Sequence, residues 1–118
     1  MNQLVAGGPI LIVEDDKKTS DLVSLYLERE GFGTIAAYSG YQALDLAAQH
    51  APILVILDVV LPDLDGWNIC RKIRAASTVP ILMLSGMGEA HERIKGLELG
   101  ADDYVAKPFS PREVVERV

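Results

Sequence analysis

Short runs of apolar residues with no polar face constrain the fold more than any other feature of this sequence. The clearest run covers residues 53–57, and residues 10–13 and 79–84 form two more. A strand that is half exposed alternates apolar and polar residues, whereas a strand covered on both faces is apolar throughout and is typical of parallel sheets. These runs therefore predict buried parallel strands with helices on both sides of the sheet.

Segments with helical periodicity alternate with the apolar runs along the whole chain. The expected helices cover residues 16–30, 39–50, 67–75, 89–99 and 111–118, and the two remaining, weaker strands cover 33–37 and 104–106. The apolar face of the first helix is expected to hold Leu22, Val23, Tyr26 and Leu27. Strict alternation predicts an α/β fold, a doubly wound (βα)5 five-stranded parallel sheet. For its strand order we adopt the flavodoxin-like 2-1-3-4-5 that is common in this class.

The length of 118 residues, with 49% hydrophobic and 24% charged residues, is that of a single folded domain. We expect this domain to cover residues 9–118, after a flexible N-terminal extension over residues 1–8. Valines still mark an apolar face where the last helix stops, so we expect the chain to be truncated within its fifth helix.

Charge and cysteine usage exclude several classes of function. A net charge of −6 argues against direct nucleic-acid binding, which needs a basic surface. The single cysteine, Cys70, cannot form an internal disulfide and favours a reducing compartment. No run approaches the roughly 18–20 apolar residues of a membrane span, and the N-terminus lacks the features of a signal peptide. We therefore expect a cytoplasmic protein without membrane association.

Polar residues follow four of the five expected strands, where the carboxyl ends of parallel strands meet at one edge of the sheet. They are Glu14, Asp15, Asp58, Ser85 and Lys107. Each has an ordinary alternative: the acidic residues could begin a helix, Asp58 could begin a turn, Ser85 could lie in a plain loop and Lys107 on the surface. Convergence of all of them on one edge favours a functional site.

The chemistry of this set suits phosphoryl transfer. Carboxylates that lie close together repel one another unless a cation is present, and oxygen ligands suit Mg2+, with Mn2+ as an alternative. An aspartate can act as a nucleophile and become an aspartyl phosphate. We therefore expect Asp58 to attack, Glu14 and Asp15 to hold the metal, and Lys107 and Ser85 to bind the phosphoryl oxygens.

Four segments, residues 10–16, 57–66, 80–85 and 100–109, occur in the order and at the spacing of a known family. Over residues 9–118 the chain resembles the receiver domain of two-component response regulators. The resemblance implies that a sensor histidine kinase phosphorylates Asp58. It also implies a metal site formed by Glu14, Asp15, Asp58 and the main-chain carbonyl of Val60, and a coupled switch pair formed by Ser85 and Tyr104.

Residues 92–104 and 107–113 are similar to receivers that carry a winged-helix DNA-binding effector domain. In that subgroup, phosphorylation produces a homodimer through the fourth helix, fifth strand and fifth helix, and DNA is contacted only through the effector, which is absent from this chain. The residues implied for this face are Arg93, Asp102, Asp103, Glu113 and Arg117. We hypothesise cross-dimer pairs of Arg93 with Glu113 and of Asp103 with Arg117. A solvated surface is the simpler alternative.

Three other functions compete with a receiver. An aspartyl-phosphate enzyme would often place a second aspartate two residues after the nucleophile, where this chain has Val60. A phosphorylation-independent interaction module has no need of Asp15, Asp58 and Lys107 together. A flavodoxin-type nucleotide binder would want a phosphate loop in place of the acidic residues after the first strand. We therefore expect a phosphoacceptor rather than an enzyme that turns over external substrates.

Overall fold

The computed structural model describes residues 8–59, 61–63, 65–85, 103–106 and 111–118. Five strands form a single sheet in the order β2-β1-β3-β4-β5, and every neighbouring pair is parallel. The strands are β1 (Ile10–Val13), β2 (Thr34–Ala37), β3 (Leu54–Asp58), β4 (Ile81–Ser85) and β5 (Asp103–Ala106). The predicted α/β class and the adopted strand order are both confirmed.

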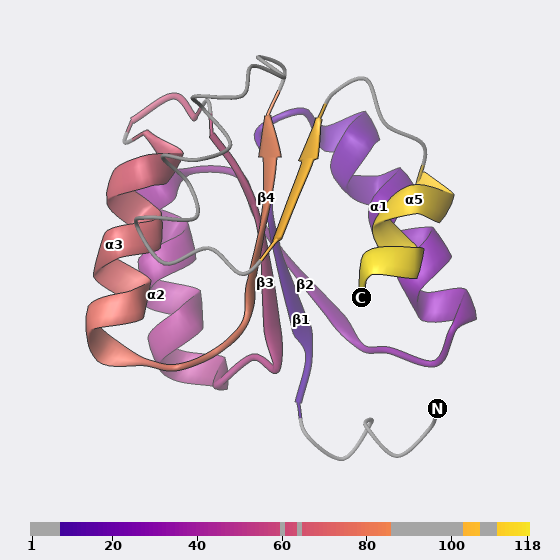
Figure 1. Cartoon of the computed structure of the whole chain (residues 1–118), viewed down its shortest axis with the longest axis horizontal. Helices are drawn as coiled ribbons and strands as arrows, with labels where there is room; N and C mark the ends of the chain where they lie inside the picture. The colour runs from indigo at the N-terminus through magenta and orange to yellow at the C-terminus, as the bar shows by residue number, and fades with distance from the viewer. Residues whose placement is uncertain (1–7, 60, 64, 86–102, 107–110) are drawn as a thin grey trace.

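Helices cover both faces of the sheet, as Figure 1 shows: α2 and α3 lie on one side, and α1 and α5 lie on the other. Their bounds are α1 (Lys17–Arg29), α2 (Gly40–His50), α3 (Gly66–Ala76) and α5 (Pro111–Arg117). The helix expected over residues 89–99 lies outside the described residues, as do residues 1–7. Within the described part of the chain, no helix has the length and apolar character needed to cross a bilayer.

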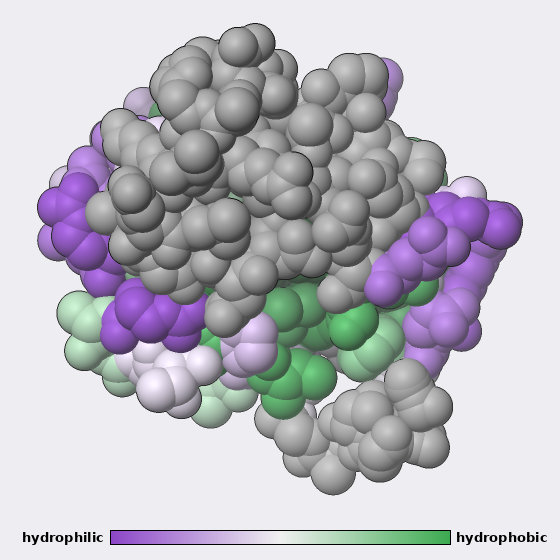
Figure 2. All heavy atoms as spheres, in the orientation of Figure 1, coloured by the Kyte–Doolittle hydropathy of each residue, from purple (hydrophilic) through white to green (hydrophobic). Residues whose placement is uncertain are grey.

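The core consists of two apolar layers, one on each face of the sheet. Successive strand residues point to opposite faces, so Leu11, Val55 and Leu57 pack toward α2 and α3, while Ile12 and Ile56 pack toward α1 and α5. Cys70 is fully buried in the first layer, where its side chain packs as a small apolar residue. Figure 2 shows hydrophilic residues on the outer flanks of both helical layers. Residues 10–13, 54–57 and 81–84 are thus apolar throughout because both faces of β1, β3 and β4 are covered.

The buried face of α1 differs from the expected one. The helix buries Ser20, Val23 and Leu27, whereas the side chain of Leu22 is 45% exposed. Leu22 lies next to Val23 in sequence and is therefore turned about 100° around the helix axis, away from the sheet. The prediction for Leu22 was wrong because the four apolar residues cover a wider arc of the helix surface than the arc that packs against the sheet.

Ser20 gives a first testable prediction. Its side chain is fully buried, and its hydroxyl has no hydrogen-bond partner among the residues that the structure describes. A buried polar group without a partner costs about 1–3 kcal/mol, so Ser20→Ala is expected to raise the free energy of unfolding by about 1 kcal/mol. Urea unfolding measures the change, with Ser24→Ala, which removes a bonded hydroxyl from the same helix, as the comparison. A marked destabilisation by Ser20→Ala would show that this hydroxyl has a partner.

Candidate functional site

The sheet register brings Glu14 and Asp58 together at the carboxyl edge. Ile12 is paired with Ile56 across β1 and β3, and two residues further along each strand come Glu14 and Asp58. Because side chains alternate with a period of two, Glu14 and Asp58 leave the same face of the sheet on neighbouring strands, about 4.8 Å apart. Both side chains are buried, with exposed fractions of 1% and 3%. Asp58 is the last residue of β3, whereas the sequence predicted it to be the first residue after the strand.

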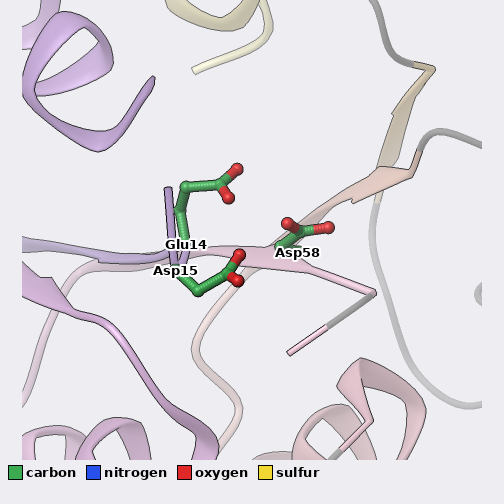
Figure 3. A group of neighbouring side chains, drawn as sticks. All are labelled: Glu14, Asp15 and Asp58. Carbon is green, nitrogen blue, oxygen red and sulfur yellow. The ribbon is translucent and has the colours of Figure 1, made fainter. Parts of the chain in front are cut away.

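Asp15 completes a group of three carboxylates. One oxygen from each of Glu14, Asp15 and Asp58 lies within 4.8 Å of the others. Figure 3 shows the three side chains directed into the same space, from the end of β1 and the end of β3. Asp15 is exposed, whereas Glu14 and Asp58 are buried. Glu14 and Asp58 are therefore shielded from solvent by the protein, and the group is accessible to solvent at Asp15.

Hydrogen bonds with backbone groups hold Glu14 in place. The N–H of Glu14 donates to the carbonyl of Ala37 at 3.0 Å, which extends the β1–β2 pairing by one residue. The N–H of Asp16 donates to Oε2 of Glu14 at 3.1 Å and orients its side chain. Asp16 itself is the N-cap residue of α1, and it is the first residue of the helix expected over residues 16–30. Local chain geometry thus holds Glu14 in position before any ligand binds.

The start of α3 packs tightly against the backbone of Asp58. A Cβ atom added at Gly66 would lie 2.4 Å from the carbonyl oxygen of Asp58 and 2.6 Å from Cα of Val59. The N–H of Gly66 donates to the carbonyl of Val59 at 2.7 Å. Only a residue without a side chain allows this approach. Gly66 therefore lets the start of α3 lie directly against the backbone at the end of β3.

The donor set suits a hard divalent cation. All three groups offer carboxylate oxygens, which Mg2+ and Ca2+ prefer, and Mg2+ commonly uses few protein ligands and keeps several waters. Three negative charges within 4.8 Å repel strongly without a cation. The open side at Asp15 leaves room for waters or for a phosphate oxygen. Glu14, Asp15 and Asp58 are therefore the described residues that could hold Mg2+.

The other predicted site residues are described only in part. Ser85 ends β4 and is paired with Ala106, and Tyr104 in β5 is paired with Met83, but their side chains lie outside the described part. Val60, Lys107, Arg93 and Asp102 lie wholly outside the described residues. Asp103 lies in β5, and Glu113 and Arg117 lie in α5; their side chains are likewise not described. The roles expected for these residues remain predictions.

Two residues beside the site were missed in the sequence analysis. Neither residue was assigned a role there beyond the possibility that Asp58 begins a turn; they are Asp63 and Gly66. In the structure, Asp63 accepts hydrogen bonds from the backbone of α2, and Gly66 provides space for a close backbone contact. A Gly within a turn-forming segment is a weak signal for close approach, and nothing near Asp63 in sequence points to α2.

The fold and the carboxylate group together define the class of this protein. A flavodoxin-like parallel sheet with acidic residues at the carboxyl ends of β1 and β3 is the arrangement that the resemblance implied for a receiver. The model of the response regulator receiver domain family matches residues 10–118, and the chain belongs to this family.

Relatives and solved structures agree with this assignment. The chain is 46% identical over 109 residues to a probable transcriptional regulator, ycf27, of Guillardia theta; the match covers 92% of this chain and 43% of the relative. It is similar to the BeF3-activated N-terminal receiver domain of Klebsiella pneumoniae RstA, with 33% identity, a TM-score of 0.87, and coverage of 92% of this chain and 93% of the other. It is also similar to DrrB of Thermotoga maritima, described as an OmpR/PhoB homologue, with 34% identity, a TM-score of 0.86, and coverage of 92% and 49%. The chain thus spans less than half the length of ycf27 and about half that of DrrB.

Proposed function

We propose that this chain is a phosphorylation-activated receiver that works in the cytoplasm. Asp58 accepts a phosphoryl group from a sensor histidine kinase in a Mg2+-dependent reaction. The observation that carries the proposal is the convergence of Glu14, Asp15 and Asp58 within 4.8 Å in a chain of the receiver family.

The described residues support distinct roles in this reaction. When bound, Mg2+ offsets the negative charge of the carboxylates and of the phosphoryl group. A carboxylate oxygen of Asp58 attacks phosphorus, so that a P–O bond forms while the P–N bond to the donor histidine breaks and its electron pair leaves with the imidazole. Asp58 is buried at the end of a paired strand, which holds the attacking oxygen in place. Glu14 and Asp15 are the remaining carboxylate ligands.

The family resemblance supplies the remaining roles. It assigns Lys107 and the hydroxyl of Ser85 to the phosphoryl oxygens, and the main-chain carbonyl of Val60 to the metal. Because Val60 stands where many aspartyl-phosphate enzymes carry an acid, we assign Asp58 to storage of the phosphoryl group rather than to turnover. Ser85 and Tyr104 are then the pair that changes conformation after phosphorylation.

The output of the receiver is proposed to be transcription control through a homodimer. Its dimer face would include Arg93, Asp102, Asp103, Glu113 and Arg117. DNA would be contacted through a C-terminal effector domain. The name of the Guillardia theta relative and the OmpR/PhoB relationship of DrrB support this reading.

The proposed function is tested by phosphorylation from a small donor. In acetyl phosphate and MgCl2, intact-mass analysis is expected to show a gain of one phosphoryl group, and removal of Mg2+ with a chelator is expected to prevent it. Asp58→Asn should abolish the gain because it removes the nucleophilic carboxylate at nearly constant volume. Asp45→Asn makes the same change on the exposed side of α2 and should leave the gain intact. A wild-type protein that gains no phosphoryl group, or an Asp58→Asn variant that gains one as readily, would contradict the proposal.

A further inference from the structure

Asp63 connects the segment after Asp58 to a different helix. Its Oδ1 accepts a hydrogen bond from the N–H of Gly40 at 2.7 Å, and its Oδ2 accepts one from the N–H of Tyr41 at 3.0 Å. Both donors are the first two residues of α2 and lie 22 or 23 residues earlier in the chain. The carboxylate therefore bridges two elements that follow different strands.

The hydrogen bonds of Asp63 are made in addition to the N-cap that α2 already has within its own sequence. Ser39 is the N-cap residue, and its hydroxyl accepts from the N–H of Gln42 at 3.2 Å. The carbonyl of Ser39 accepts from the N–H of Ala43 at 3.0 Å, which is the first bond within the helix. Asp63 satisfies the two N–H groups that remain, and its negative charge lies at the positive end of the helix dipole. An aspartate at this place thus forms two charge-assisted hydrogen bonds at once.

The chain between β3 and α3 is held by hydrogen bonds at Val59 and Asp65, and Asp63 is fixed between these two residues. At its start, the N–H of Val59 donates to the carbonyl of Leu84 at 3.0 Å. At its end, Asp65 is the N-cap residue of α3 and accepts from the N–H of Asn68 at 2.9 Å. The segment between Asp58 and α3 begins directly at the proposed phosphoacceptor, so the clamp to α2 restrains the loop that borders the metal site.

We propose that Asp63 is a positioning residue. Its two hydrogen bonds to the start of α2, which we call the clamp, restrain the chain between Asp58 and α3. The clamp thereby sets the geometry of the metal site and its affinity for Mg2+. The inference rests on the proposed function, because it assumes that Glu14, Asp15 and Asp58 bind Mg2+. It adds a residue that touches neither the metal nor the phosphoryl group. A purely local role, in which Asp63 only stabilises α2, is the competing explanation.

The first test compares three substitutions by calorimetric titration with MgCl2. Asp63→Ala removes both acceptor oxygens and is expected to raise the Mg2+ dissociation constant by about threefold to tenfold. Asp63→Asn keeps one acceptor oxygen and is expected to give an intermediate value. Asp45→Asn removes an exposed charge from α2 itself and should leave the dissociation constant unchanged. Amide exchange at Gly40 and Tyr41, followed by NMR, should be faster in Asp63→Ala, which reports the loss of the clamp independently of the metal.

A second test separates the clamp from the charge of Asp63. Tyr41→Pro removes one of the two donating N–H groups without changing any charge, and proline is tolerated in the first turn of a helix. Tyr41→Ala keeps that N–H and removes the same, 63% exposed, side chain. Weaker Mg2+ binding in Tyr41→Pro than in Tyr41→Ala is the expected result. If Tyr41→Pro fails to fold, the order wild type, Asp63→Asn, Asp63→Ala decides the question.

Two failures remain distinguishable. If the wild type binds no Mg2+ and gains no phosphoryl group, the proposed function is wrong. If the wild type does both, and Asp63→Ala exchanges its Gly40 and Tyr41 amides faster but binds Mg2+ with wild-type affinity, the proposed function stands and the positioning role is overturned. Asp63 would then serve only to stabilise α2.

Discussion

Gly66→Ala is expected to lower the free energy of unfolding by about 2–4 kcal/mol. The added Cβ would lie 2.4 Å from the carbonyl oxygen of Asp58 and 2.6 Å from Cα of Val59. Both neighbours are backbone atoms of a paired strand end and cannot rotate away as a flexible side chain would. The start of α3 must therefore move outward, which also breaks the 2.7 Å hydrogen bond from Gly66 to Val59. Urea unfolding measures the effect.

The matched control is Gly33→Ala. Within the described part of the chain, no atom beyond the neighbouring residues in sequence lies within 4 Å of a Cβ added at Gly33, so this substitution should change the free energy of unfolding by less than about 0.5 kcal/mol. The same outward movement of α3 should slow phosphorylation of Asp58 by acetyl phosphate in Gly66→Ala. Equal stability of the two variants would mean that the close approach at Asp58 does not exist in solution.

Asp58→Asn is expected to make the metal-free protein more stable and to remove its response to Mg2+. Three carboxylates within 4.8 Å repel one another, and neutralising one should raise the free energy of unfolding by about 1–3 kcal/mol in a chelator. In the wild type, Mg2+ binds only the folded state and should add about 4.1 kcal/mol at a thousand times its dissociation constant. The order of stability should therefore reverse between chelator and saturating MgCl2.

Urea unfolding in each condition, monitored through the single tryptophan, Trp67, measures this reversal. Trp67 lies in the first turn of α3, next to the residue that contacts the backbone of Asp58, and is a suitable reporter of folding. Asp45→Asn should follow the wild type in both conditions. Mg2+ stabilisation of Asp58→Asn as large as that of the wild type would exclude Asp58 from the metal site.

Much of the fold could be predicted because burial acts on every residue of a strand. Ile56 and Leu57 point to opposite faces, and both are fully buried, so an apolar run without a polar face was a reliable sign of a covered parallel strand. Leu22 was misplaced because periodicity gives the direction of an apolar face but not its width. The strand order came from the fold class, since local pattern carries no information on which strands are neighbours.

The sequence predicted those residues of the site that lie at the carboxyl ends of strands. Glu14 and Asp58 converge because their strands are adjacent and in register; the adjacency came with the fold class, and the register was found in the structure. The contacts of Asp63 could not be predicted, because its partners are backbone N–H groups that every residue has. The demand for space at Gly66 was equally hidden, since it arises from the distance between α3 and β3 rather than from a local conformation.

The pairing of Asp58 with Leu84 has a consequence for how far a chemical event at this aspartate must act. Leu84 is paired in turn with Val105 of β5. The edge strand β5 therefore lies two strand spacings from Asp58, about 10 Å. The shortest route from Asp58 to that strand runs across β4, through the backbone pairing of β3 with β4 and of β4 with β5. A shift of β4 would therefore be passed on to the edge of the sheet through this pairing.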